Sequence, residues 1–365
     1  MWPLLPHSTP VTAGGQAIFR VLPGILLLLA TSGAAPLSAQ QVTSLIEGCT
    51  DCRIVFDTVA ILGEPQGPGM LHDEAVELAV DDRGRYFVLS DTGSTVKVFS
   101  SDGAFLTAVG GRGDGPGEIQ MARTIHVEPD GTLFVPDRIL ARVSVFDPDL
   151  ALERTVAVDE PRLLGFSILP MPEDAFLVAG HSLEPELVGY AAHLLSSDGA
   201  RVRSFGEKTY TVGSRDPFYH ERDVAPADPD RLWIAGWDRY QIELWTLAGE
   251  RLAIYERDPD WFTRPARAPD GTVAPRPTLR SVQQDPSGLL WVGLRIAADD
   301  WMDGPYRSDF VLEVIDPDSG EWLLSHRESG RFSNLFGDRL VGRTVVEEGE
   351  AAARILVLKM ELEAP

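Results

Sequence analysis

The stretch GGRGDGPGEIQMARTIHVEPDGTLFVPD, residues 110–137, contains the features that decide the fold. A glycine-rich segment is followed by a Glu-Pro-Asp-Gly turn at 128–131 and then by the β-rich run Leu-Phe-Val at 133–135. Asp, Gly and Pro clusters favour turns, whereas Val, Leu and Phe favour short strands. The same order of features recurs along the chain, so the sequence is best read as a series of repeats.

Each repeat combines a turn signal with a short apolar run that follows it. The turn signals lie at 82–84, 128–131, 172–174, 228–230, 285–288 and 347–349, and the apolar runs at 86–88, 133–135, 176–178, 232–234, 290–292 and 355–357. The repeats hold four short apolar runs and show no helical period. Four strands in a repeat of roughly 40–60 residues are typical of a β-propeller blade.

The count of strands predicts how the ring closes. Five full repeats extend from about Ala75 to Arg339, and the remaining stretch, 340–363, has room for three strands. A spare apolar run at 53–62 precedes GEPQGPG, which matches GRGDGPG at 111–117 after the fourth strand of the first repeat. We therefore expect the N-terminal strand to complete the last blade, which removes exposed sheet edges. The sequence predicts an all-β, six-bladed β-propeller as a single domain over residues 53–363.

The motif at 110–118 and the run at 127–137 resemble the NHL-repeat family of six-bladed propellers. The resemblance covers residues 53–363 and is clearest in the first two blades. It implies the same six-bladed fold, in which the glycines serve backbone conformations. It does not imply one function, because unrelated activities share propeller folds.

Two features near the N-terminus predict an exported protein. Residues 1–39 place Arg20 before the apolar run 21–30 and a series of small residues, the order found in a secretory signal peptide; an uncleaved anchor is the alternative. In the linker expected at 40–52, Cys49 and Cys52 form a C-x-x-C pair. Without a second pair, a redox or zinc role is weaker than a short structural disulfide in an oxidising compartment. We expect a periplasmic or secreted monomer.

The charge balance excludes some partners. With 32 basic and 55 acidic residues, the chain has a net charge of −23. Such a surface repels nucleic acid and anionic membranes. The chain offers no second hydrophobic stretch long enough to span a bilayer.

Arginines recur at one position of the repeats. Alignment of the blades on their second strands places Arg123, Arg222 and Arg280 at the start of the innermost strand, and Arg343 joins them if a small insertion is allowed. The next residue is polar each time: Thr124, Asp223, Ser281 and Thr344, with Glu77 in the first blade. Guanidinium groups at a channel mouth suit carboxylate or phosphate ligands. The alternative is that each arginine pairs with an acidic neighbour between blades.

Long insertions are expected on the same face, at 111–121, 207–221, 256–278, 296–308 and 328–340. Three tryptophans, Trp237, Trp261 and Trp301, fall in these loops, whereas Trp233, Trp245, Trp291 and Trp322 fall in strand-like runs and are expected in the core. Exposed rings beside arginines would suit a glycan, a peptide or another amphipathic ligand. Packing of the loops on their own aromatic residues is the alternative.

An enzymatic reading has less support. The resemblance to calcium-dependent propeller lactonases would require channel asparagines, and the chain has only Asn334. Propeller lyases that use zinc need channel histidines, for which the candidates are His72, His126, His181, His193, His220 and His326, without an H-x-H spacing. Asp299, Asp300 and Asp303 lack the Gly and Glu placement of a calcium loop. We expect a binding protein without a cofactor or chemistry of its own, calcium and zinc not being excluded; a metal-dependent lyase or hydrolase is the alternative.

Overall fold

The computed structural model describes residues 41–49, 51–72, 77–158, 163–182, 186–187, 189–206, 222–236, 239–262, 271–303, 307–346 and 352–363. The predicted signal peptide, residues 1–39, lies outside the described residues. The described part consists of short β-strands and two 3-10 turns, η1 (Asp91–Gly93) and η2 (Pro172–Asp174). In this part, no helix has the length and apolar character needed to cross a membrane.

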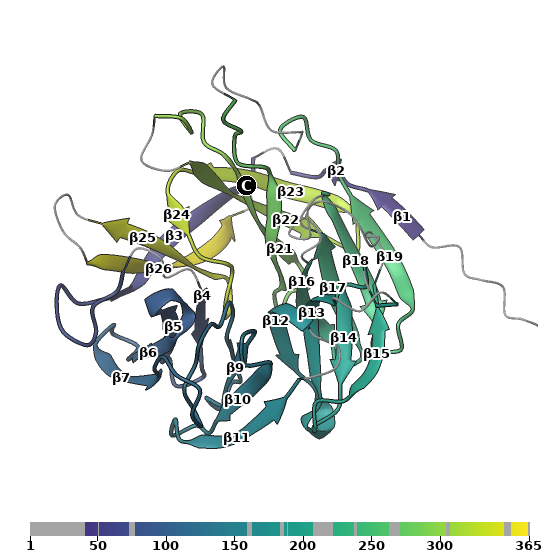
Figure 1. Cartoon of the computed structure of the whole chain (residues 1–365). Helices are drawn as coiled ribbons and strands as arrows, with labels where there is room; N and C mark the ends of the chain where they lie inside the picture. Colours follow the sequence, from purple (N-terminus) through teal and green to yellow (C-terminus); the bar gives the residue numbers. More distant parts are fainter. Residues whose placement is uncertain are drawn as a thin grey trace, which may run out of the picture. The chain divides into compact units, whose positions relative to one another are not determined.

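The strands form six sheets arranged as blades around a central channel (Figure 1). Each strand of a blade pairs antiparallel with the next, and in blades 1 to 5 the first of the four strands along the chain lies innermost. Blade 1 contains β4 (Glu77–Val80), β5 (Tyr86–Ser90), β6 (Thr95–Phe99) and β7 (Phe105–Gly110); blade 2 contains β8 (His126–Val127), β9 (Leu133–Asp137), β10 (Arg142–Phe146) and β11 (Leu152–Ala157). Blade 3 contains β12 (Leu163–Pro170), β13 (Phe176–Ser182), β14 (Ala192–Leu195) and β15 (Arg201–Phe205).

The second half of the ring follows the same plan. Blade 4 contains β16 (Arg222–Asp228), β17 (Arg231–Gly236), β18 (Gln241–Thr246) and β19 (Arg251–Glu256); blade 5 contains β20 (Thr278–Gln284), β21 (Leu290–Ala297), β22 (Ser308–Asp316) and β23 (Glu321–Glu328). Blade 6 contains β24 (Arg331–Phe332), β25 (Leu340–Val346), β26 (Ala353–Glu363) and β3 (Arg53–Leu62). The predicted six-bladed all-β fold is confirmed.

Blade 6 closes the ring as expected but is divided differently. The N-terminal strand β3 pairs antiparallel with the C-terminal β26, from Ile355 opposite Leu62 to Glu363 opposite Arg53. The innermost strand is β24, which lies within 328–340. From the sequence, 328–340 was expected to be an insertion and the three strands of this blade were expected within 340–363. That assignment was wrong because β24 has only two residues, too few to give a recognisable strand pattern. As a result, the run at 355–357 lies on the third strand of the blade and not on the second.

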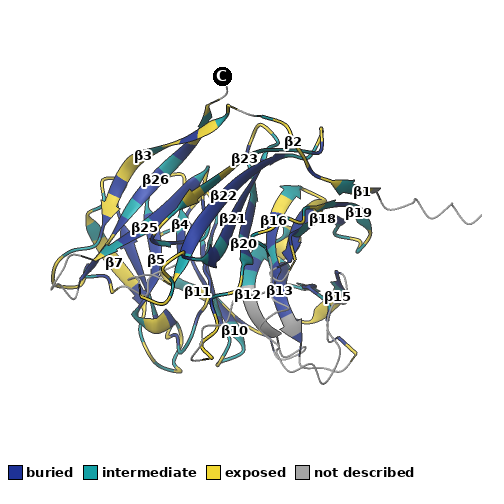
Figure 2. Cartoon of the chain, turned by 90° about the horizontal axis from the view of Figure 1, so that it is seen from above, coloured by how far each residue is buried: buried dark blue, intermediate teal, exposed yellow. Residues whose placement is uncertain are grey.

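The core lies between the blades. Apolar side chains of adjacent sheets form six buried clusters, and each cluster is shared by two neighbouring blades. One of them joins blade 6 to blade 1 and so completes the ring. Figure 2 shows β22 almost entirely buried, whereas β7 and β3 carry exposed residues. Trp233 and Trp291 on the second strands are buried as expected. Since every blade buries both faces, loss of one blade would expose two clusters.

The glycines of the motif at 110–118 have a conformational role. Gly110, Gly111 and Gly117 have φ values of 87°, 125° and 77°. These values lie in the region that side-chain-bearing residues rarely adopt. A methyl group on Gly110 would also lie 2.5 Å from Cδ1 of Ile119. The motif therefore shapes the connection between blades 1 and 2.

The segment expected as a linker, 40–52, contains two additional strands. β1 (Gln41–Ser44) pairs parallel with β19, and β2 (Ile46–Glu47) pairs parallel with β23. The segment thus adds a fifth strand to blades 4 and 5 and covers their outer edges, which would otherwise present unpaired backbone groups. Cys49 and Cys52, with sulfur atoms 1.99 Å apart, form a disulfide within this segment, directly before β3.

Candidate functional site

A cavity of ≈ 680 Å³ runs along the channel and is lined by residues of the innermost strands of blades 1 to 5 and by the segment that follows β24 in blade 6. Its lining extends from the first residues of these strands, such as Glu77 and Asp223, to the turns that follow them, such as Asp82 and Pro286. The volume lies in the range of small-molecule sites. The cavity is therefore the natural candidate for a binding site.

One level of the cavity is polar. Four of its residues occupy equivalent positions in their blades. Each pairs with a residue of the second strand that lies two places after the large apolar residue of that strand (Phe87, Leu177, Trp233 or Trp291). The pairs are Glu77 with Leu89, Ser167 with Ala179, Asp223 with Ala235 and Ser281 with Gly293. Thr124 and Asn334 complete the set from blades 2 and 6. We call these six residues the polar ring. The polar position predicted at the start of the innermost strands is thus present. In blade 6 it is occupied by Asn334 and not by Thr344, which lies on the second strand, β25.

The polar ring also connects neighbouring blades. Asn334 donates from Nδ2 to Oε1 of Glu77 over 2.7 Å, which links blade 6 to blade 1. The amide of Val282 donates to Oδ2 of Asp223 over 2.9 Å, and the amide of Leu335 donates to Oγ of Ser281 over 3.2 Å. These bonds hold the innermost strands in register around the channel.

Two carboxyl groups of the polar ring, those of Glu77 and Asp223, are half-buried in the channel wall. Burial raises the pKa of Glu77 to about 8, against the opposing effect of the Arg280 charge, and Asp223 raises it further. Burial also raises the pKa of Asp223 to about 7, although the amides of Val282 and Val224 and the charge of Arg280 favour ionisation. Loss of hydration disfavours the charged form of a carboxyl group. Near neutral pH, both groups can gain or lose a proton.

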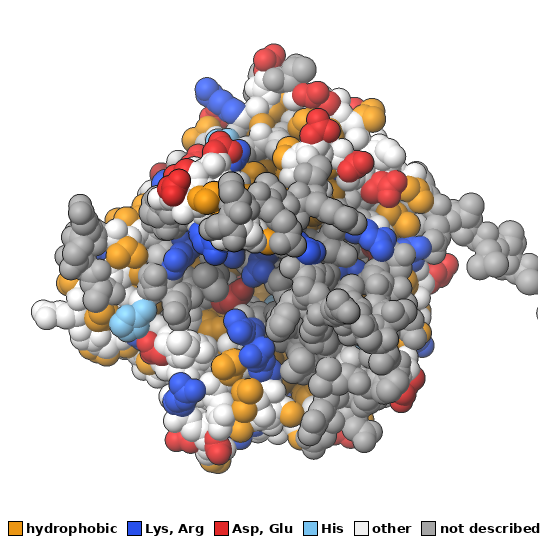
Figure 3. Space-filling model, turned by 45° about the horizontal axis from the view of Figure 1, so that its top comes forward, with side chains coloured by type: hydrophobic (Ala, Val, Ile, Leu, Met, Phe, Trp, Pro, Cys, Tyr) orange, Lys and Arg blue, Asp and Glu red, His pale blue; other side chains and the backbone are white. Residues whose placement is uncertain are grey.

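Three arginines gather beside these carboxyl groups. Arg280 acts electrostatically on both Glu77 and Asp223. The pKa of Arg295, on β21, is lowered to about 10 by burial and by the like charges of Arg280 and Arg331. Figure 3 shows basic side chains gathered over the middle of one face, around an acidic patch. In a chain of net charge −23, this concentration of guanidinium groups is a local reversal of sign.

The four arginines selected from the sequence have different positions. Arg222 begins β16 and is buried, with Cζ 3.5 Å from where a methyl group on Gly236 would lie. Arg280 is on β20 beside the carboxyl pair, and Arg123 is exposed just before β8. Arg343 was placed wrongly. It lies on β25, the second strand, and its Cζ is 5.7 Å from the ring centroid of Phe332. Arg331 is the arginine of the innermost strand in blade 6.

Neither Arg295 nor Arg331 was selected from the sequence. Arg295 lies on a second strand, and the alignment considered only the first. Arg331 lies in the two-residue β24, within a stretch taken as a loop. A search for basic residues near every predicted blade start, rather than at one aligned position, would have found Arg331.

The loop tryptophans do not form one surface in the described part of the chain. Trp237 lies outside the described residues. Trp261 packs edge-to-face on Tyr240 and Phe262, with ring centroids 6.5 and 5.9 Å away, so it packs within its own loop region. The ring of Trp301 has the guanidinium of Arg307 5.8 Å from its centroid. Among the strand tryptophans, Trp245 is buried and Trp322 is partly buried.

The residues that the structure describes contain no group of three or more His, Cys, Asp or Glu side chains placed to hold a metal ion. Of the candidate histidines, His126 lines the cavity, His193 bonds to Ser204 and His326 pairs with Glu328. His220 lies outside the described residues. Asp299, from the loop considered for calcium, pairs with Arg327 at 2.9 Å.

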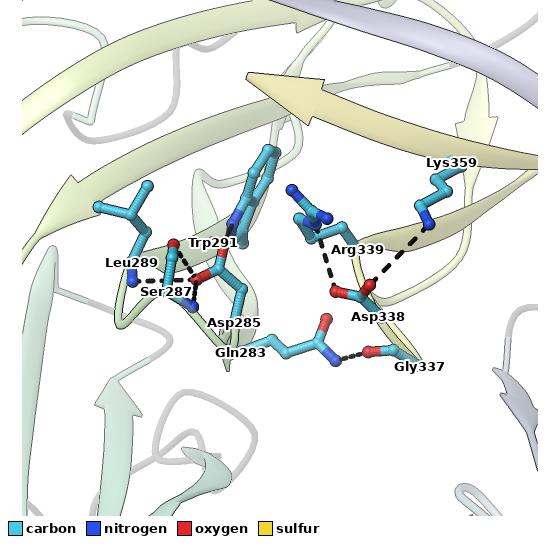
Figure 4. A network of polar contacts seen from close by, with 9 residues as sticks. All are labelled: Gln283, Asp285, Ser287, Leu289, Trp291, Gly337, Asp338, Arg339 and Lys359. Carbon is cyan, nitrogen blue, oxygen red and sulfur yellow. Dashed lines mark hydrogen bonds and ion pairs between the residues drawn. The ribbon is translucent and has the colours of Figure 1, made fainter. Parts of the chain in front are cut away.

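The opposite end of the cavity is lined by turns. Figure 4 shows two groups there. Asp285 accepts bonds from Ser287, the amide of Leu289 and the indole of Trp291, which fixes its turn. Asp338 lies between Arg339 and Lys359, at 3.2 and 3.9 Å, and Gln283 donates to the carbonyl of Gly337.

Comparison with known proteins supports the architecture. The model of the DUF5128 family, described as a 6-bladed beta-propeller, matches residues 74–175. No curated protein matches the chain in sequence. Two solved structures are similar: a DUF4221 family member from Bacteroides vulgatus (TM-score 0.58, 8% identity, 86% of this chain and 99% of that one) and a protein from Bacteroides fragilis described as exported (TM-score 0.59, 12% identity, 88% and 100%).

A third similar structure, virginiamycin B lyase from Staphylococcus aureus, has a TM-score of 0.47 and 9% identity, with 86% of this chain and 100% of that one covered. At these identities the likeness concerns the fold alone. The chain is a six-bladed β-propeller whose first two blades are similar to the DUF5128 family.

Proposed function

We propose that the protein binds a small anionic ligand, carrying a carboxylate or phosphate group, at the arginine end of its channel. The observation that carries this proposal is the placement of Arg280 beside both Glu77 and Asp223, of Arg295 beside Glu77, and of Arg331 beside Arg295. Guanidinium groups bind planar oxyanions through paired charge-assisted hydrogen bonds. Arg222 and the exposed Arg123 would extend the basic rim.

The electrostatics favour an external anion. Like charges repel, and the lowered pKa of Arg295 reflects both its burial and the repulsion from Arg280 and Arg331. The carboxyl groups of Glu77 and Asp223 are incomplete counterions, because burial raises their pKa values to about 8 and about 7.

The proposal includes a location outside the cytoplasm. A leader-like stretch at 1–39 and a disulfide between Cys49 and Cys52 support it, since structural disulfides persist in oxidising compartments. We also retain the NHL-type interpretation of the repeats, based on the motif at 110–118.

The test is calorimetric titration with inorganic phosphate and with succinate. Arg280→Gln and Arg295→Gln should each weaken binding of one or both anions about tenfold or more, because a charge-assisted hydrogen bond contributes about 1.5–3 kcal/mol. The control is Arg339→Gln, which removes a guanidinium paired with Asp338 at the other end of the cavity. This control should bind as the wild type does.

The competing interpretation makes the arginines structural links between blades. In that case Arg280→Gln and Arg295→Gln would lower the melting temperature strongly, and neither anion would bind the wild-type protein. That combination would overturn the proposal. Small changes in melting temperature together with weakened anion binding would support it.

A further inference from the structure

The residues that line the cavity differ in charge from those at the arginine end of the channel. Its lining contains six carboxyl groups, from Glu77, Asp81, Asp82, Asp223, Asp285 and Asp338, and Lys359 is the only Lys or Arg in the lining among the described residues. Arg280, Arg295 and Arg331 do not belong to this lining. The cavity therefore presents acidic groups, and the arginines lie outside its lining.

Several of the acidic groups are occupied by partners. Asp81 pairs with Arg85 at 2.7 Å, Asp285 accepts bonds from its own turn and from Trp291, and Asp338 pairs with Arg339 and Lys359. Glu77 and Asp223 differ from these three because they are half-buried in the cavity wall at the polar ring, where each accepts a hydrogen bond from a neighbouring blade. They are the groups able to receive a donor from the cavity.

One further polar side chain lines the passage. Gln283 lies two residues beyond Ser281 on β20, so both side chains are on the same face of the strand. Its Nε2 donates to the carbonyl of Gly337 (Figure 4), and its Oε1 is shielded from the cavity. Gln283 therefore fixes the blade 6 turn and leaves Glu77 and Asp223 as the acceptors that face the cavity.

Between these polar groups the cavity wall is apolar. It includes Val80, Ile125, Ile168, Val224 and Val282, one from each of five blades. From the polar ring to the turn at Asp82, five residues of extended strand span roughly 16 Å. The cavity thus combines two carboxyl acceptors with a long apolar passage that ends at the turns.

We infer that the channel holds a protonated amine on an apolar body, which enters between the turns and places its ammonium group at Glu77 and Asp223. The ammonium ion has donors and no acceptor, which matches the carboxyl oxygens of these two residues. The apolar body would lie along the valine and isoleucine wall. This site is distinct from the proposed anion site, because the arginines are absent from the lining of the cavity.

The experiment compares three probes of equal chain length: octylamine, octanol and octanoate, each titrated into the folded protein below its micellar concentration. Octylamine should bind with one-to-one stoichiometry and at least tenfold more tightly than octanol, and octanoate more weakly still. Tighter binding of octanoate, equal binding of octylamine and octanol, or no binding of any probe would each overturn the inference.

Variants locate the ammonium group. Glu77→Gln and Asp223→Asn, which keep the size of each side chain, should each weaken octylamine at least about fivefold, while Asp102→Asn, in an exposed turn of blade 1, should not change it. If a ring variant fails to fold, Val224→Trp should block the passage and abolish octylamine binding in its place. Unchanged octylamine binding in every folded ring and passage variant would contradict the assignment.

The arginine variant separates the two sites. Arg280→Gln should weaken phosphate or succinate binding but should leave octylamine binding unchanged or stronger, because it removes a positive charge near Glu77 and Asp223. Loss of octylamine binding in this variant would contradict the inference. Loss of anion binding alone bears only on the proposed function.

Discussion

At the scale of the residue, Glu77 and Asp223 connect the fold with the chemistry of the channel. Each is held by a hydrogen bond from a neighbouring blade, Glu77 from Asn334 and Asp223 from the amide of Val282. Burial raises both pKa values, to about 8 and about 7. The same groups therefore align the blades and respond to pH and to charged ligands.

This predicts a pH dependence of stability. In the unfolded chain both carboxyl groups titrate near about 4, so the folded protein binds more protons than the unfolded chain between that pH and the raised values. The free energy of unfolding should then fall as the pH rises from about 5 to about 9. In Glu77→Gln the fall should be smaller by at least about 1.4 kcal/mol, the free energy of one pKa unit. Denaturant unfolding at several pH values measures it.

The control for this prediction is Asp102→Asn. Hydrogen bonds, first that from Ser100, lower the pKa of the exposed Asp102 carboxyl, so it stays ionised over the whole range and its removal should leave the slope unchanged. A Glu77→Gln variant with the wild-type slope would mean that Glu77 ionises normally in the folded protein.

Individual residues also show where prediction from the sequence succeeded and where it failed. The polar position at the start of the innermost strand was identified correctly from the sequence for Glu77, Thr124, Asp223 and Ser281. In blade 6 the assignment slipped by one strand, which selected Arg343 and Thr344 in place of Arg331 and Asn334. Ser333 explains why the true strand can be so short: its hydroxyl accepts from the amide of Gly342 over 2.8 Å, and its amide donates to the Gly342 carbonyl.

At the scale of the element, the N-terminal segment is more than a linker. β1 and β2 pair with the outer strands of blades 4 and 5, and the disulfide between Cys49 and Cys52 follows directly before β3. Local composition could not predict this pairing, because parallel partners on β19 and β23 are distant in sequence. The pair of cysteines was recognisable, whereas the edges that the segment covers were not.

For the disulfide we expect complete formation in exported protein. Intact-mass measurement after alkylation should show no alkylated thiol until reductant is added. Because the loop closed by the bond is very short, its loss should lower the free energy of unfolding by no more than about 1–2 kcal/mol. The variant Cys49→Ser/Cys52→Ser tests this by denaturant titration. Two freely alkylated thiols in the exported protein would instead revive a redox or metal role for the pair.

At the scale of the whole molecule, the architecture was accessible from the sequence because it repeats. Turn signals and short apolar runs recur in every blade, and the matching motifs at 63–69 and 111–117 indicated that the first strand closes the ring. The site was less accessible. Arg295 comes from a second strand, Arg331 from a very short one, and the hydrogen bond of Gln283 to Gly337 depends on side-chain packing that no repeat pattern encodes.

The central claim is that the arginine end of the channel accepts an anion, and the most direct measurement is an anomalous difference map from a crystal soaked in selenate. The account predicts a strong selenium peak within hydrogen-bonding distance of the guanidinium groups of Arg280, Arg295 or Arg331. A map with selenium sites elsewhere and none near these arginines, each of them bonded only to protein carboxylates, would contradict it.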